Sequence, residues 1–485
     1  MGAAEQPRVH FQLLGKRERT AEDVMIKRVR DLIPARRDVL KLGSLSLLGA
    51  FADTALWPPK LRAAGRSNPR GTARFAIVVE AAGAISHVDT FDFKENEGTP
   101  DDIDVRQINN ELYLSHRLFP ELSTEMDKVD VVRTFKSHEV VHFRGEYYTR
   151  AGRPLNPAQA AEIPPVGSII ASELESARRE SDTFPTYISC NLGSSALPTG
   201  FLHPRFSGLD INAKAGAGSV SAEGDALAAL EERFRLLKEL DEVMSEGRKG
   251  RGRNIESFHD FQEDAYRILG DTRWPTALTM ADADKERYGD SSVGLGCLLA
   301  RNLVQADAGT RFIHVKHAGW DHHKNIFTKP DGGHYQHCND LDRGVANLLR
   351  DLAATPSPRE GVGTLLDETM VVVATEFGRV PGPLNGVAGR HHYNQTYVGL
   401  FAGGGVQGGR IIGKTDATGE HCVETGWKYG MQIKTENIYA SVYSALGIDW
   451  RKEIKDTPSR RVYRYVDPLG ATEPCIDDEI KELFV

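Results

Sequence analysis

The architecture of this chain follows from one apolar run, Phe75-Ala76-Ile77-Val78-Val79-Glu80, which leads into a glycine-containing loop. Apolar and β-branched residues without polar alternation are typical of a strand that is buried on both faces of a sheet. The same pattern returns at residues 129–134, 311–315, 369–375 and 397–402. These five runs predict the strands of a central sheet.

Helical patterns separate these strands. Leu295, Leu299 and Leu303 lie on one helical face before the third strand, and apolar residues within 341–352 recur at helical spacing before the fourth. A shorter helix is predicted at residues 118–126. Strands that alternate with helices build a mostly parallel sheet with helices on both faces. We therefore predict an α/β fold, in which ligands bind at the carboxyl ends of the strands.

Composition excludes several classes of protein. The 485 residues hold 68 acids against 60 bases, a formal charge of −8, which argues against a nucleic-acid partner. Five cysteines without a Cys-x-x-Cys pair exclude a disulfide-dense scaffold and a four-cysteine zinc ribbon. No stretch reaches the roughly 18 apolar residues of a membrane-spanning helix. We therefore expect an enzyme-sized globular protein without a membrane span.

The start of the chain resembles an export signal. The pair Arg36-Arg37 precedes Asp38-Val39-Leu40-Lys41 and a mildly apolar run over residues 42–51. This order is similar to a twin-arginine signal, which the export machinery reads as an address and which is not part of the fold. A basic surface turn before an amphipathic helix is the alternative. We predict export by the twin-arginine machinery and a periplasmic or secreted location.

The domain organisation follows from this interpretation. Residues 1–63 form an N-terminal extension with the signal, and residues 64–485 form one α/β domain. Residues 207–270 interrupt the rhythm of strands and helices, which predicts a helical insertion. The insertion contains a basic run at residues 248–253, which has the charge to contact phosphate but is interpreted as a solvated turn.

Histidines gather near the end of the third strand. Six of the sixteen histidines fall within residues 314–338. Asp321 and His323 lie on the loop just beyond the strand. A carboxylate and an imidazole two residues apart on such a loop can converge on one divalent metal, so we expect a metal site here.

The other histidines of this stretch have structural explanations. His314 alternates with apolar residues in the strand, so we expect it and His317 to be buried core residues. His334, His337 and Cys338 have the side chains for a second metal cluster, but their position favours the start of the next helix.

Three further strand ends carry metal-ligating side chains. Glu376 directly follows the fourth strand, where a carboxylate is suited to ligate metal or to act as a base. His392 lies in the loop Gly389-Arg390-His391-His392-Tyr393, before the fifth strand. The first strand is followed by Ser86-His87-Val88-Asp89-Thr90-Phe91-Asp92. We expect these groups to meet at one edge of the sheet.

One glycine-rich motif does not indicate a nucleotide site. The run Gly403-Gly404-Gly405-Val406-Gln407-Gly408 matches the G-x-G-x-x-G pattern of dinucleotide-binding loops. Such a site needs a helix next, because the amino end of that helix binds the pyrophosphate. Residues 410–413 predict another strand instead, so we expect a glycine turn.

The motifs together resemble a known family. They are Ser86-His87-Val88-Asp89-Thr90-Phe91-Asp92-Phe93-Lys94, Leu298-Leu299-Ala300-Arg301, Gly319-Trp320-Asp321 with His323, Glu376-Phe377-Gly378-Arg379 and Ala402-Gly403-Gly404-Gly405. The set is similar, in order from about residue 75 to 449, to the exported domain-of-unknown-function family 1501. That family looks like a branch of the alkaline phosphatase and sulfatase superfamily. The resemblance implies a sulfatase-like α/β sandwich with metal at the strand ends.

The resemblance also implies metal ligands. Asp321, His323 and His392 resemble the ligands of one divalent metal, which is Zn, Ca, Mg or Mn. Glu376 stands where an Asp-His pair ligates a second metal, but Phe377 replaces the histidine and has no ligand atom. The second site therefore lacks one ligand of the set that the resemblance implies.

An acidic ligand near the first strand is implied as well. Glu80 ends this strand near the place of the superfamily's first acidic ligand, but two alanines follow it, and the role falls to Asp89.

Residues 141–153 resemble the sulfatase helix that carries the nucleophile. His142 stands at its head in place of serine or cysteine, and histidine acts as a nucleophile or as a general acid or base. We assign catalytic roles to His142 and Arg379. The alternative is that the usual nucleophile has been lost.

These features predict an exported, metal-dependent hydrolase of sulfate or phosphate esters. Its substrate would be a small anionic ester or a sulfated or phosphorylated glycan. The alternative is a catalytically degenerate sulfatase-fold protein with a binding or cell-envelope role, which Phe377 and the missing serine or cysteine favour. A metal-dependent isomerase or mutase on the same fold is a third hypothesis.

Overall fold

A computed structural model of the chain describes residues 67–109, 111–216, 228–229, 232–236, 239, 263–328, 333–470 and 473–485. The described residues lie in one compact unit, Gly65–Val485. The predicted export signal at Arg36 and Arg37 lies outside the described residues, as do the basic run 248–253 and most of the predicted insertion 207–270. Within the described part, no helix is both long and apolar enough to cross a membrane.

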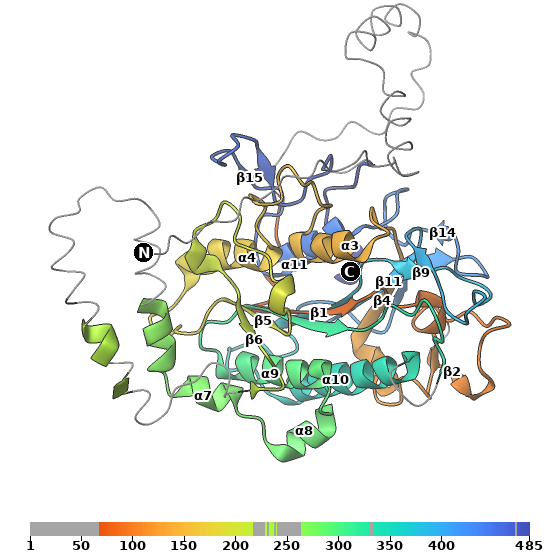
Figure 1. Cartoon of the computed structure of the whole chain (residues 1–485), viewed down its shortest axis with the longest axis horizontal. Helices are drawn as coiled ribbons and strands as arrows, with labels where there is room; N and C mark the ends of the chain where they lie inside the picture. The colour runs from red at the N-terminus through yellow and green to blue at the C-terminus, as the bar shows by residue number, and fades with distance from the viewer. Residues whose placement is uncertain are drawn as a thin grey trace, which may run out of the picture. The chain divides into compact units, whose positions relative to one another are not determined.

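The core of the fold is an eight-stranded sheet in the order β12-β4-β11-β8-β1-β7-β5-β6 (Figure 1). Its strands are β1 Phe75–Ala82, β4 Val129–Phe135, β5 Tyr187–Cys190, β6 Leu209–Ile211, β7 Phe312–Ala318, β8 Thr369–Ala374, β11 Tyr397–Ala402 and β12 Ile411–Ile412. All five predicted strands are confirmed. The sheet is parallel except at β11, which runs antiparallel to both β4 and β8.

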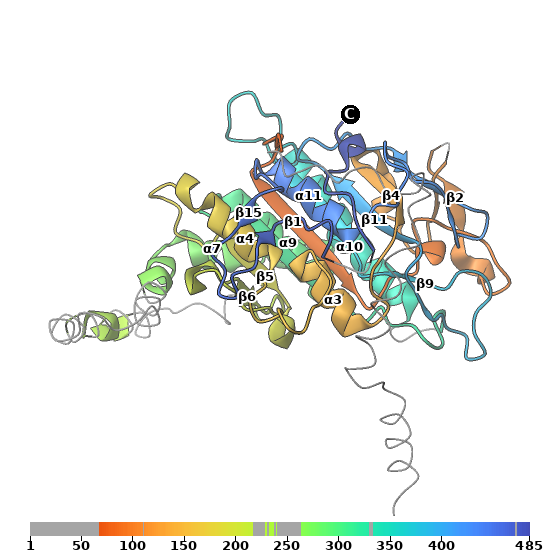
Figure 2. The ribbon, with the colours of Figure 1, turned by 90° about the horizontal axis from the view of Figure 1, so that it is seen from above.

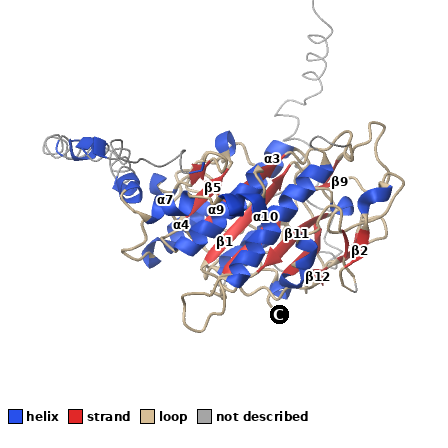
Figure 3. Ribbon diagram, turned by 90° about the horizontal axis from the view of Figure 1, so that it is seen from below, coloured by secondary structure: helices blue, strands red, loops and turns tan. Residues whose placement is uncertain are grey.

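Helices cover both faces of the sheet, as predicted. Figures 1 and 2 show α3, α4 and α11 over one face, and Figure 3 shows α9 and α10 across the other. The α-helices with defined bounds in the described part are α3 His142–Ala151, α4 Val166–Leu174, α7 Arg273–Leu278, α8 Asp282–Tyr288, α9 Ser292–Ala306, α10 His334–Ala354 and α11 Thr435–Ala445. The predicted helix start at His334 is confirmed by α10.

In the described part of the chain, four short hairpins lie outside the central sheet. They are β2 Val105–Gln107 with β3 Tyr113–Ser115, β9 Gly378–Arg379 with β10 His392–Tyr393, β13 Lys414–Thr415 with β14 Cys422–Glu424, and β15 Glu453–Ile454 with β16 Tyr463–Arg464. The hairpin of β9 and β10 follows β8 and carries two of the predicted site residues, Arg379 and His392.

Residues of β1 alternate between two cores. Phe75, Ile77 and Val79 pack in the core that contains α9 and α10, whereas Ala76 and Val78 pack in the core that contains α4 and α11. Such burial on both faces explains the unbroken apolar run from which the fold was predicted.

The helix predicted at residues 118–126 was wrong. Two short 3-10 turns, Leu122–Thr124 and Met126–Lys128, occupy this stretch. The carboxylate of Asp342, on α10, accepts hydrogen bonds from the backbone N–H groups of Glu121 and Leu122. The backbone N–H groups are therefore paired without the hydrogen bonds of a longer helix. The apolar residues of the stretch are buried in this conformation too.

The glycine-rich run after β11 is a turn, as expected. Gly403 and Gly404 have φ values of +62° and +59°, which favour glycine. A Cβ at Gly404 would lie 2.8 Å from the Cβ of Met370. The chain continues into β12, so no helix begins where a pyrophosphate would need one.

The one polar residue of β1 is held in a buried ion pair. Arg150 of α3 donates to both carboxylate oxygens of Glu80 at 3.0 Å, and His314 Nε2 of β7 lies 2.8 Å from Glu80 Oε2. Burial would raise the pKa of Glu80, but Arg150 and His314 lower it to about 2. The contact therefore stabilises the fold above the unfolded-state pKa of about 4.3 and is lost as the pH falls toward 2.

We expect Arg150→Met to lower the free energy of unfolding by about 3–5 kcal/mol, because it leaves the buried Glu80 carboxylate without its main partner. Urea denaturation at pH 7 measures the change. Arg106→Met is the control, since Arg106 and Asp104 form an exposed ion pair and its loss should leave stability unchanged. Equal stability of the two variants would contradict the structural role of Arg150.

Candidate functional site

Most of the predicted site residues come together at the carboxyl end of β7 and β8. Asp321 and His323 lie on the loop after β7, and His392 lies on β10. Across the β9–β10 hairpin, His392 is paired with Arg379. His142 reaches the same place as the first residue of α3. Segments far apart in sequence therefore supply one cluster, as predicted for the strand ends of an α/β sheet.

The centre of the cluster is one carboxylate oxygen, Asp321 Oδ1. Three imidazole nitrogens approach it: His142 Nε2 at 2.9 Å, His323 Nε2 at 3.0 Å and His392 Nε2 at 3.6 Å. The Nε2 atoms of His323 and His392 lie 2.8 Å apart. One ligand atom from each of these four residues lies within 4.8 Å of all the others. The four side chains are therefore close enough to share one ion.

Hydrogen bonds outside the cluster orient two of the imidazoles. His392 Nδ1 donates to the backbone carbonyl of Val140 at 2.6 Å, because a carbonyl oxygen can only accept. His142 Nδ1 lies 2.8 Å from Glu376 Oε1. Each ring therefore directs Nε2 toward Asp321. Such outer partners fix the tautomer and the orientation of metal-binding histidines.

Electrostatics favour neutral imidazoles at His323 and His392, beside an ionised carboxylate at Asp321. Burial lowers the pKa values of His323 and His392. Burial would raise the pKa of Asp321, but Arg379 and His142 hold it well below its ordinary value. For His142, burial is outweighed by Glu376 and Asp321, which raise its pKa. His323 and His392 are thus in the protonation state that binds metal.

Arg379 forms the inner wall of the site. Its side chain is 1% exposed, and Nη2 donates to Asp321 Oδ1 at 2.7 Å. The same guanidinium donates to the backbone carbonyls of Gly83, Ala84, Trp320 and Arg390. This network fixes a positive charge next to the cluster.

Glu376 lies beside the cluster rather than within it. Its Oε1 accepts from the backbone N–H of Gly83 and contacts His142 Nδ1, both at 2.8 Å. Phe377 is buried, with its ring centre 5.1 Å from that of His142 and 5.0 Å from that of His392. An apolar ring therefore packs against two imidazoles of the cluster, and it has no atom that could bind a metal.

Asp89 and Glu80 are not brought into the cluster. Arg390 binds both carboxylate oxygens of Asp89, at 2.6 and 3.0 Å, and Ser86 Oγ donates to Oδ2 at 2.5 Å. Glu80 is bound by Arg150 and His314 in the same complete way. Both carboxylates therefore form buried ion pairs with arginines. For Asp89, which was predicted to ligate a metal, the partner in this structure is Arg390.

Three groups at the site were missed by sequence reasoning. Two are backbone groups, the carbonyl of Val140 and the N–H of Gly83, for which a sequence carries no signal. The third is Gly145 in α3, where a Cβ would lie 2.8 Å from the Cβ of Glu376. A glycine inside a predicted helix often indicates such close packing, and Gly145 lies inside the helix-like segment 141–153.

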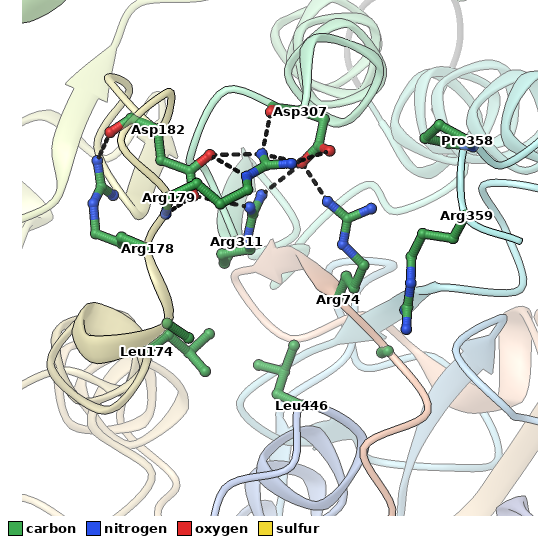
Figure 4. Close-up of a pocket in the computed structure, with 12 residues that line it drawn as sticks. Arg74, Leu174, Arg178, Arg179, Asp182, Asp307, Arg311, Pro358, Arg359 and Leu446 are labelled. Carbon is green, nitrogen blue, oxygen red and sulfur yellow. Dashed lines mark hydrogen bonds and ion pairs between the residues drawn. The ribbon is translucent and has the colours of Figure 1, made fainter.

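A second polar region lies at the other end of the strands (Figure 4). Arg74 and Arg311 immediately precede β1 and β7, and they line a pocket of about 500 Å³. The carboxylate of Asp307 is shared by Arg74, Arg179 and Arg311 at 2.5–3.1 Å, and Asp182 binds Arg179 and Arg311. This region is an ion-pair network without imidazole ligands, so we place the functional site at the opposite edge.

Comparisons with solved structures show low similarity. The chain is similar to a protein in the alkaline phosphatase superfamily from Vibrio parahaemolyticus, at 12% identity over 81% of this chain and 72% of that one, with a TM-score of 0.35. It is also similar to the phosphonate monoester hydrolase from Silicibacter pomeroyi, at 10% identity over 77% of this chain and 73% of that one, with a TM-score of 0.36. A third similar structure is the C-terminal periplasmic domain of EcEptC from Escherichia coli, in complex with Zn. Its identity is 10% over 84% of this chain and 87% of that one, and its TM-score is 0.31. The comparison with curated proteins gave no match.

A family comparison is more informative. The model of the family described as "Protein of unknown function (DUF1501)" matches residues 73–468. The matched segment contains the whole central sheet and every residue of the cluster around Asp321. Because the match spans most of the chain, the protein belongs to the DUF1501 family.

Proposed function

We propose that the protein is an exported, metal-dependent hydrolase of sulfate or phosphate esters. The observation that carries this proposal is the convergence of three imidazoles and one carboxylate at the carboxyl edge of the sheet. The resemblance of the strand-end motifs to the alkaline phosphatase and sulfatase superfamily supports the choice of ester. A small anionic ester or a sulfated or phosphorylated glycan is the proposed substrate.

The residues fit one divalent transition metal. His392 carries its proton on Nδ1, so the lone pair on its Nε2 is directed at His323 and Asp321. Two imidazoles and a carboxylate are an established donor set for zinc, and three protein ligands leave a position open for substrate. We propose Asp321, His323 and His392 as ligands, as the superfamily pattern implies, and leave His142 for chemistry.

The chain's own residues have separate tasks in this proposal. A cation bound at the cluster would supply a Lewis acid for the ester oxygen. Arg379 positions Asp321 and contributes a fixed positive charge that favours an anionic substrate. His142 is held by Glu376 through Nδ1, so Nε2 is the atom that attacks or transfers a proton. Phe377 packs against the rings of His142 and His392 and keeps water from that side.

Metal content and turnover test the proposal together. We expect the purified protein to hold a divalent metal and to hydrolyse an aryl phosphate or an aryl sulfate. The double variant Asp321→Ala/His392→Ala should lose the metal and more than about 100-fold in kcat/KM, since even partners of ligands contribute 10–100-fold. Elemental analysis and chromogenic assays measure both quantities.

The matched control is His421→Ala, because the His421 side chain is 70% exposed. This variant should keep both metal and turnover. Native protein without metal and without turnover on either ester would overturn the proposal. Metal that is bound by the native protein and lost in the double variant, without any turnover, would favour the degenerate binding protein.

Glu376→Gln separates metal binding from catalysis. The substitution removes the charge that orients His142 but keeps the shape of the side chain. We expect metal content to stay unchanged and kcat/KM to fall about 10–100-fold. Loss of metal in this variant would show that Glu376 is itself a ligand.

Export is tested at the paired arginines. We expect Arg36→Lys/Arg37→Lys to leave the protein in the cytoplasm, because the twin-arginine machinery reads the pair itself. Fractionation of cells that express the native and variant chains, followed by immunoblotting, measures the distribution. Equal export of both chains would contradict the proposed route.

A further inference from the structure

We propose that His317, His337 and Asp340 form a second metal site, which binds a divalent first-row transition metal. The site shares no residue with the cluster around Asp321. It lies between β7 and α10, on the side of the sheet opposite to α3. The proposal is independent of the proposed ester hydrolysis, because its observations come from a different part of the fold.

Strand alternation places His317 on the α10 side of the sheet. Ile313 and Val315 of β7 pack in the core that contains α9 and α10, and His317 follows with the same parity. His314, with the opposite parity, points to Arg150 and Glu80 on the α3 side. The two histidines of β7 therefore face different layers, and among the described residues only His314 has an ion-pair partner, Glu80.

The other two donors come from the first turns of α10. His337 and Asp340 are three residues apart, so their side chains lie on one face of the helix. One ligand atom each from His317, His337 and Asp340 lies within 4.8 Å of the other two. The rings of His317 and His337 are 5.4 Å apart between centres.

Buried nitrogen atoms at this place have no hydrogen-bond partner among the described residues. The side chain of His317 is 2% exposed, and its Nδ1 is unpaired. Nδ1 of His337 is buried and unpaired as well. A buried polar atom without a partner destabilises a fold by about 1–3 kcal/mol, so two of them on neighbouring rings require an explanation. A shared cation would bind the lone pairs of both rings.

The surroundings are built for such a site. Gly319 has a φ of +110°, and a Cβ there would lie 2.6 Å from Cε1 and 2.7 Å from Nε2 of His337. This glycine therefore makes room for the imidazole. The ring of Trp320 is fully buried and lies 5.2 Å from that of His317 and 5.5 Å from that of His337. Gln336 Nε2 donates to Asp340 Oδ1 at 2.8 Å, which orients the carboxylate.

The donor set decides the class of metal. Two imidazoles and one carboxylate bind Zn²⁺ and Fe²⁺, with further positions left to water. Hard cations such as Ca²⁺ and Mg²⁺ prefer a set of oxygens, which these residues do not offer. We therefore assign the site to a first-row transition metal and use Zn²⁺ as the probe.

Zinc stoichiometry tests the second site. The full-length protein is stripped with a chelator, dialysed against Zn²⁺ and analysed for zinc per chain. We expect two equivalents in the native protein and one in His337→Asn. Asp321→Ala/His392→Ala should also hold one, and adding His337→Asn to it should leave none. His421→Asn is the control, as an exposed histidine whose loss should leave two equivalents.

Zinc content unchanged in His337→Asn would overturn the proposal, as would an Asp321→Ala/His392→Ala variant that binds no zinc. Asp340→Asn serves as a second variant in case His337→Asn misfolds, because asparagine keeps the shape of the aspartate side chain. It should bind one equivalent of zinc and give the circular dichroism spectrum of the native protein. Cobalt gives a further readout that requires no substitution at His317, His337 or Asp340. The Asp321→Ala/His392→Ala variant loaded with Co²⁺ should keep a visible absorption band, and its absence would contradict the site.

Discussion

The carboxylate of Asp321 is the contact on which the rest of the site depends. Its Oδ1 accepts from Arg379 at 2.7 Å and faces imidazole nitrogens of His142, His323 and His392. The Arg379 side chain is 1% exposed, whereas that of Asp321 is 48% exposed. The ion pair therefore has a buried side and an open side. The buried charge holds the carboxylate in place, and the open side leaves it accessible to a cation and a substrate.

The two ends of the central strands carry different chemistry. At the amino ends of β1 and β7, Arg74 and Arg311 share carboxylates in a network of ion pairs. At the carboxyl ends, the loop after β7 and the β9–β10 hairpin bring Asp321 and the imidazoles together. The parallel sheet makes this separation possible, because all its parallel strands end at the same edge. Between the two ends, Glu80, Arg150 and His314 tie α3 to the sheet and so set the position of His142.

The fold was largely predictable from the sequence, because strands buried on both faces read as unbroken apolar runs. The antiparallel course of β11 was not predictable, since pairing direction leaves no trace in such a run. The proximity of Asp321, His323 and His392 was expected from their positions in loops beside strands. The helix that begins at His142 was implied by the resemblance of residues 141–153. The ion pair of Asp89 with Arg390 was not predicted, because the two residues lie 301 positions apart in the chain. The site formed by His317, His337 and Asp340 was missed for a similar reason: each residue has an ordinary place in a strand or helix, and only packing joins them.

The central claim is that Asp321, His323 and His392 bind one divalent metal. A crystal of the native protein loaded with zinc, measured at the zinc absorption edge, tests it most directly. We expect an anomalous peak about 2.0–2.2 Å from Asp321 Oδ1 and from the Nε2 atoms of both histidines. We also expect those two Nε2 atoms to move apart from their separation of 2.8 Å, since both would then face the ion. A zinc-loaded crystal without a peak at this position, in which the two imidazoles remain hydrogen-bonded to each other, would contradict the account.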